Sequence, residues 1–107
     1  MDAIGELVLD LLPGNEKVRA RIFPPIEEIP GETWACRFEI SAPFHSKCDV
    51  KGSTSLQALA LALQVLSAEL YGSAEYKAGR LGALGEFGGY LTIPAPQVVL
   101  DIAPFPF

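Results

Sequence analysis

The sequence is poor in the side chains on which several protein functions depend. It has one histidine, and only eight lysine and arginine residues stand against thirteen acidic ones. General acid–base catalysis uses histidine most often, and nucleic-acid affinity comes mainly from Lys and Arg contacts to phosphates. The net charge of −5 should also be repelled by anionic membranes. We therefore expect no nucleic acid and no membrane as a partner.

Long apolar runs are missing as well. No segment has the roughly 18 uninterrupted apolar residues typical of a membrane-spanning helix. The opening stretch MDAIGELVLDLLPG begins with an acid and has no Lys or Arg before its apolar residues, which is unlike a secretory signal peptide. These features predict a cytoplasmic protein. In that compartment Cys36 and Cys48 are expected as reduced thiols.

The reactive side chains show no arrangement typical of a catalytic or metal site. His45, Ser41 and Asp49 lie in or beside one expected turn, whereas the members of a catalytic triad usually converge from separate elements. Cys36, His45 and Cys48 offer three ligands in no familiar spacing, and structural zinc sites use four. The sequence therefore predicts no catalytic residue, no metal, no cofactor and no enzymatic activity.

Two segments near the N-terminus predict a β-hairpin. Residues 4–12 and 16–23 alternate between apolar and polar side chains, as half-buried strands do, and Pro-Gly-Asn between them is a tight-turn signal. Folding about this turn places opposite charges across the strands on the solvent side. The expected pairs are Glu6 with Arg21 and Asp10 with Lys17. The small basic cluster around Arg19 then belongs to a charge-balanced outer face, and an anion site is the alternative.

The remaining strand signals are uneven. TWACRFEIS at 33–41 alternates most clearly, with Trp34, Cys36, Phe38 and Ile40 facing inward. The proline-rich residues 24–33 are expected to form a connection, and 48–52 a short strand. The glycine-rich segment 79–89 is expected to be a mobile loop or an irregular hairpin. Residues 90–93 and 97–102 are further strand candidates.

The segment STSLQALALALQVLSAELY predicts a helix over about 55–71. Thr54 and Gln57 have the spacing of a capping box, and Gly72 suits the left-handed conformation that ends many helices. Five leucines share an arc of roughly 80° on a helical wheel, enough to cover one face of a sheet. They are Leu56, Leu59, Leu63, Leu66 and Leu70.

The opposite side of this helix is apolar too, where an ordinary amphipathic helix would carry charges. A second apolar side needs a second covering, either the chain's own C-terminal segment or another chain. The apolar tail, with Phe105 and Phe107, should likewise pack on this molecule or on a neighbour. The candidate interface residues are Ala58, Leu61, Ala62, Val65, Ala68, Phe105 and Phe107.

One combination of motifs resembles a known family. Trp34-x-Cys36 in a strand, followed by Ser55-Leu56-Gln57-Ala58-Leu59 at the start of an Ala/Leu-rich helix, resembles an uncharacterised family of small bacterial proteins. The resemblance covers about residues 34–93. It implies no activity, cofactor or catalytic residue.

These patterns predict a single domain over residues 1–107 with an α+β fold. We expect an antiparallel sheet of about four to five strands, with the helix at about 55–71 packed on one face. The function expected is that of a small cytoplasmic, non-enzymatic protein-interaction module that self-associates. The alternatives are an immunity-like protein that neutralises a bacterial toxin, and a small-ligand or anion binder that uses the Gly-rich loop 79–89.

Overall fold

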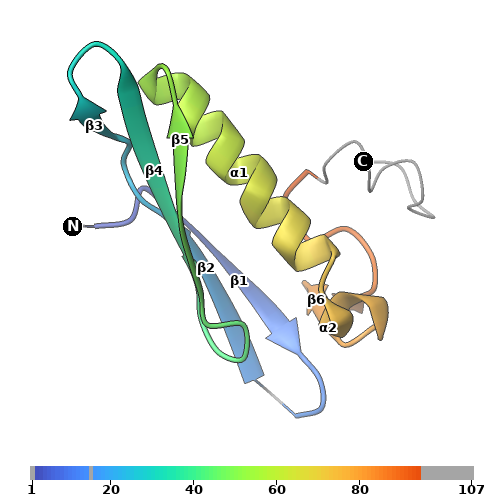
Figure 1. Ribbon diagram of the computed structural model, residues 1–107. Helices are drawn as coiled ribbons and strands as arrows, with labels where there is room; N and C mark the ends of the chain where they lie inside the picture. The colour runs from blue at the N-terminus through green and yellow to red at the C-terminus, as the bar shows by residue number, and fades with distance from the viewer. Residues whose placement is uncertain (1, 15, 95–107) are drawn as a thin grey trace. The chain divides into compact units, whose positions relative to one another are not determined.

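The computed structural model describes residues 2–14 and 16–94. It shows a small α+β fold with an antiparallel sheet and one main helix (Figure 1). Over these residues the elements are β1 (Gly5–Leu11), β2 (Glu16–Ile22), β3 (Ile26–Ile29), β4 (Thr33–Ile40), β5 (Ser46–Gly52), α1 (Ser55–Tyr71), α2 (Ala74–Lys77), β6 (Leu81–Ala83) and β7 (Glu86–Phe87). None of the helices in this part of the chain is long and apolar enough to cross a membrane.

The chain divides into two compact units. Among the described residues, unit 1 comprises 2–7 and 19–66, and unit 2 comprises 8–14, 16–18 and 67–94. The described residues contain seven strands, so the prediction of four to five was too low. The additional strands are short, and they lie in segments whose prolines and glycines favoured loops.

Strand β4 is the centre of unit 1. It pairs with β5 from Trp34–Gly52 to Ile40–Ser46. On its other side it pairs first with β3, at Ile26–Ala35, and then with β2, at Ile22–Phe38. Two prolines separate β2 from β3, and proline has no N–H for a ladder hydrogen bond. The IEEI stretch beyond them has no proline, which is why it forms a strand that the sequence analysis missed.

The predicted alternation along the strands is confirmed. Cys36, Phe38 and Ile40 of β4 are buried, whereas Arg37 between them is exposed. The predicted cross-strand ion pairs are present as well. The Arg21 Nε donates to Glu6 Oε2 at 2.7 Å, and Lys17 pairs with Asp10. The strand 48–52 begins earlier than predicted, at Ser46, which pairs with Ile40.

Helix α1 has the predicted bounds and N-terminal cap. The Gln57 N–H donates to Thr54 Oγ1 at 3.0 Å, and the Ser53 N–H donates to Gln57 Oε1 at 2.5 Å. The expectation for Gly72 was wrong, because its backbone is not left-handed. Glycine is needed there for space, since a Cβ would lie 2.7 Å from the Ala68 carbonyl oxygen.

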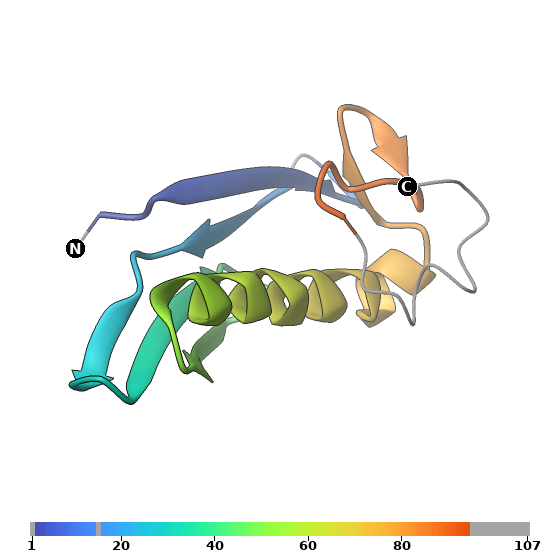
Figure 2. The same cartoon turned by 90° about the horizontal axis from the view of Figure 1, so that it is seen from above.

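In unit 1 the helix lies along one face of the strands (Figure 2), and the predicted leucine seam faces inward only in part, since Leu66 is buried and Leu59 is half-buried. Leu56 and Leu63 are 73% and 40% exposed, whereas Ala58 and Ala62 are fully buried. The end of β5 approaches the first turn of the helix closely, because Gly52 has no Cβ, which would lie only 2.6 Å from the Ala58 nitrogen. A helical wheel shows two apolar sides but does not show that the smaller side chains fit nearer to the sheet.

Unit 2 contains the glycine-rich segment, which forms an irregular hairpin of β6 and β7, as one of the two expectations had it. Strand β6 pairs with β1 at Leu81–Leu11. The Tyr71 hydroxyl accepts the Leu91 N–H at 2.9 Å and donates to the Ile93 carbonyl at 2.7 Å. Residues 90–93, a strand candidate in the sequence, form no strand. Hydrogen bonds with the Tyr71 side chain hold Leu91 and Ile93 instead. The candidate strand 97–102 lies outside the described residues.

Candidate functional site

The predicted interface residues have very different environments. Ala58 and Ala62 are covered by the chain itself and cannot contact a partner. Leu61 and Val65 are half-buried, and Ala68 is exposed. Phe105 and Phe107 lie outside the described residues. Of the predicted residues that the structure describes, only Leu61, Val65 and Ala68 are therefore accessible.

The exposed side of α1 carries further apolar residues. Leu56, Ala60 and Leu63 lie in one line along the helix, at spacings of four and three residues. We call these three residues the helix strip. No exposed residue of α1 carries a charge, and the complete set is Ser55, Leu56, Gln57, Ala60, Leu63, Gln64 and Ala68. The sequence signal that could have identified the strip is the lack of charged residues on the side of the helical wheel that carries Leu56 and Leu63.

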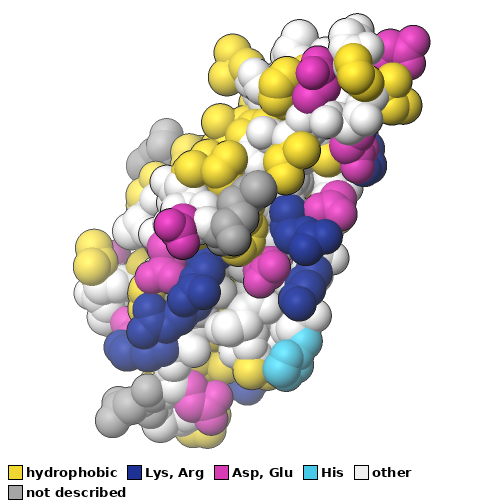
Figure 3. Space-filling view, turned by 90° about the vertical axis from the view of Figure 1, so that its left-hand side faces the viewer, with side chains coloured by type: hydrophobic (Ala, Val, Ile, Leu, Met, Phe, Trp, Pro, Cys, Tyr) yellow, Lys and Arg dark blue, Asp and Glu magenta, His cyan; other side chains and the backbone are white. Residues whose placement is uncertain are grey.

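A second exposed surface lies on the sheet of unit 1 and is highly charged. Figure 3 shows two groups of Lys and Arg side chains on this face, with acidic side chains between them. Glu6 accepts hydrogen bonds from Arg21 and from Arg19 Nη1, the latter at 3.2 Å. The hydrogen bond from Arg21 holds the pKa of Glu6 below its usual value, with a smaller contribution from Arg19. Most charges on this face are therefore already paired within the chain.

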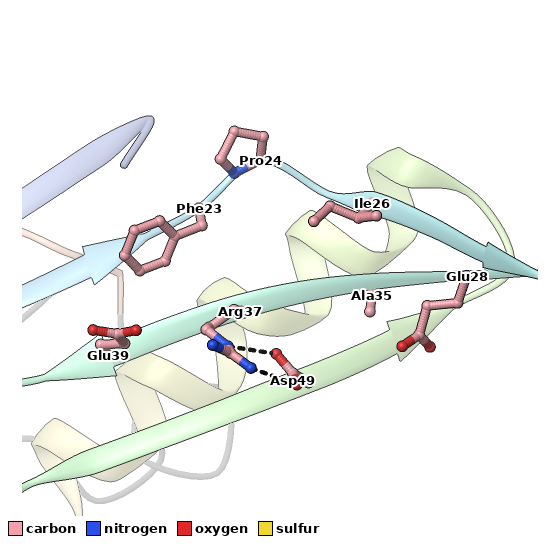
Figure 4. Close-up of a pocket in the computed structure, with 8 residues that line it drawn as sticks. All are labelled: Phe23, Pro24, Ile26, Glu28, Ala35, Arg37, Glu39 and Asp49. Carbon is pink, nitrogen blue, oxygen red and sulfur yellow. Dashed lines mark hydrogen bonds and ion pairs between the residues drawn. The ribbon is translucent and has the colours of Figure 1, made fainter. Parts of the chain in front are cut away.

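Two hollows on this charged face are lined by residues of β4. The larger, about 430 Å³, is open and has an apolar wall of Phe23, Pro24 and Ile26 (Figure 4). Its floor contains Arg37, whose Nε and Nη2 donate to the two carboxylate oxygens of Asp49 at 2.9 and 3.1 Å. That hydrogen bonding lowers the pKa of Asp49. The paired charges and the apolar wall suit contact with another molecule. Among the residues that line this hollow, no nucleophilic side chain lies beside a base.

The second hollow, about 280 Å³, lies where β2, β4 and the start of β5 meet. It contains His45, which lies in the turn after β4, as expected from the sequence. The residues lining it are Arg19, Arg21, Glu39, Ile40, Ser41, His45, Ser46 and Lys47. Both hollows lie within unit 1, and the two share Glu39.

The cysteines lie apart from both surfaces. Both are free thiols, and Cys36 is buried with its Sγ 3.2 Å from the Phe23 carbonyl oxygen. Burial raises the pKa of Cys36, which disfavours the reactive thiolate. Across the residues described, no three His, Cys, Asp or Glu side chains are grouped so that they could hold a metal ion.

The described residues thus form a small α+β protein whose accessible features are an uncharged helix strip and a charged, hollowed sheet face. The model of one family, the domain of unknown function DUF6968, matches residues 6–95. The chain belongs to this family, whose function is not established. The expected relation to an uncharacterised family is confirmed, and the match begins earlier than residue 34. Comparisons with curated proteins and with solved structures gave no match.

Proposed function

We propose that the protein is a cytoplasmic, non-enzymatic interaction module of bacterial origin that self-associates through the helix strip. One observation carries the proposal. The exposed side of α1 has no charged residue, and Leu56 is 73% exposed within the chain. A helix that faces only water normally carries charges on that side. An exposed leucine line without them is typical of a surface that another protein covers.

A second copy of the chain is the partner that fits this strip. In an antiparallel pair of helices centred near residue 60, Leu56 of each copy would lie beside Leu63 of the other. The small Ala60 at the centre allows the two helices to approach closely. The net charge of −5 opposes association of two copies. Repulsion is weakest where the contact surfaces are uncharged, as they are along α1.

The experiment compares two variants that add the same charge at neighbouring positions. Leu56→Glu places a carboxylate in the strip, whereas Gln57→Glu places one beside it, where a Glu still completes the capping box with Thr54. Sedimentation velocity at high micromolar concentration should show a dimer for the wild type and for Gln57→Glu. Leu56→Glu should be a folded monomer, because its side chain is mostly exposed in the single chain.

The proposal is wrong if the wild-type protein sediments as a monomer at that concentration. It is also wrong if both variants associate as the wild type does, since association would then use a different surface. The immunity-protein hypothesis and the ligand hypothesis for residues 79–89 stay predictions from the sequence.

A further inference from the structure

The smaller hollow on the sheet face brings together donor groups that are far apart in the sequence. Arg19 and Arg21 come from β2, Ser41 and His45 from the turn after β4, and Lys47 from β5. The pairing of β4 with both neighbours causes this convergence, because Glu39 lies opposite Arg21 on one side and opposite Lys47 on the other. The hollow is therefore a product of the sheet register.

The backbone holds this group firmly. The Ser41 N–H donates to the Arg19 carbonyl at 2.9 Å, and the Arg19 N–H donates to Ser41 Oγ at 2.9 Å. The Phe44 and His45 N–H groups both donate to the Ser41 carbonyl. His45 has a φ of 49°, a left-handed conformation that is uncommon for residues other than glycine. The turn thus keeps the only histidine of the chain at the edge of the hollow.

The donors exceed the acceptors in this hollow. Three cationic side chains line it, against one carboxylate, that of Glu39. The contacts to Glu6 use Nη1 of Arg19 and Nε of Arg21, and each guanidinium has five N–H donors. Because Ser41 Oγ accepts from a backbone N–H, its own hydroxyl hydrogen can be donated elsewhere. The lining of this hollow is therefore positively charged, although the protein as a whole has a net charge of −5.

We propose that this hollow binds a phosphate-type oxyanion. A phosphate offers three acceptor oxygens to donors that come from several directions, and guanidinium groups match its geometry. Lys47 and one arginine supply the charge, and Ser41 and His45 supply further donors. The volume of about 280 Å³ accommodates the phosphate and the first atoms of its carrier.

Two lysines of β5 provide a matched test. Lys47 lines the hollow, whereas Lys51 lies on the same strand, pairs with Glu28 and does not line it. The assay is a ¹H–¹⁵N correlation titration of the full chain with sodium phosphate, compared with sodium chloride at equal ionic strength. We expect saturable shifts at the amides of Ser41, His45 and Lys47. Lys47→Gln should weaken binding about fivefold, whereas Lys51→Gln should change it by less than about twofold.

Shifts that are equal for phosphate and chloride would overturn the proposal. An equal loss of affinity in both lysine variants would also overturn it, because it would indicate general screening instead of a site. Titrations with a phosphoserine-containing peptide and with a nucleoside monophosphate then identify the carrier, since the one that adds contacts binds more tightly than free phosphate. Neither variant alters the helix strip, so this test is independent of self-association.

Discussion

Replacement of Gly52 by alanine tests how closely the sheet and the helix approach each other in unit 1. An ideal Cβ at this position would lie 2.6 Å from the Ala58 nitrogen, 2.9 Å from the Ala58 Cα and 3.1 Å from the Gln57 carbonyl carbon. All three are backbone atoms, so no side-chain rotation can relieve the contact. Ordinary van der Waals contact begins at 3.4 Å, which requires a displacement of at least 0.8 Å, the difference between 3.4 and 2.6 Å.

The magnitude follows from two opposing effects. Overpacking of a tightly packed site costs about 1–3 kcal/mol. The alanine recovers about 0.4–1 kcal/mol by restricting the unfolded chain. We therefore expect Gly52→Ala to lower the free energy of unfolding by roughly 1–2 kcal/mol. At this chain length the melting temperature should fall by roughly 5–15 °C.

The assay is urea and thermal unfolding followed by circular dichroism at 222 nm. The control is Gly89→Ala, because a Cβ at Gly89 meets no atom within 4 Å and its φ is not in the left-handed region. That variant should be as stable as the wild type or slightly more stable. If Gly52→Ala is as stable as Gly89→Ala, the close approach of β5 to the first turn of α1 is refuted.

Two further predictions concern the hydroxyl of Tyr71 and the two thiols. Burial raises the pKa of Tyr71 from 10.0 to about 12, so its contribution to stability is complete below pH 10 and is lost as the pH rises to 12. The free energy of unfolding of the wild type should fall by about 2–3 kcal/mol over that range, and urea unfolding at pH 9 and pH 12 should show this loss. The variant Tyr71→Phe should be less stable than the wild type by about 1–3 kcal/mol at pH 7. It should lack most of the alkaline loss of stability. An equal alkaline loss in the variant would contradict the assignment. Cys48 is half-exposed and Cys36 is buried. A thiol reagent should therefore modify Cys48 rapidly in the native protein and both cysteines in urea. Rapid modification of both cysteines without urea would contradict the burial of Cys36.

Features set by neighbouring residues could be predicted from the sequence. The cap of α1 depends on Thr54 and Gln57, three positions apart, and the hairpin pairs depend on one turn. The side of the helix that faces the sheet could not be predicted, because it depends on a close approach at Gly52, which no periodicity records. Strand β3 was missed because its prolines flank the IEEI stretch without entering it.

The candidate sites were harder to predict for the same reason. The lack of charge on the helix was recognised from the sequence, but the interface was assigned to the side on which Ala58 and Ala62 are buried. Of the charged hollow, only the basic cluster around Arg19 could be recognised, with an anion site as the alternative interpretation. Its lining depends on which residue of β4 lies opposite Arg21 and which lies opposite Lys47. The first register depends on pairing between strands that are distant in the sequence, and the second depends on the position of the turn between β4 and β5, and neither can be read from a pattern along one segment.

The position of β4 has a consequence for the order in which the structure opens. Every residue from Trp34 to Ile40 is paired with β5, and the same strand is also paired with β3 and β2. Release of its amide hydrogens to solvent requires the loss of both neighbouring ladders, whereas β5 loses its partner in a single step. Hydrogen exchange should therefore be slowest at the centre of β4. This strand would be the last part of unit 1 to separate from its neighbours, and a protease would reach it only after the whole unit has unfolded.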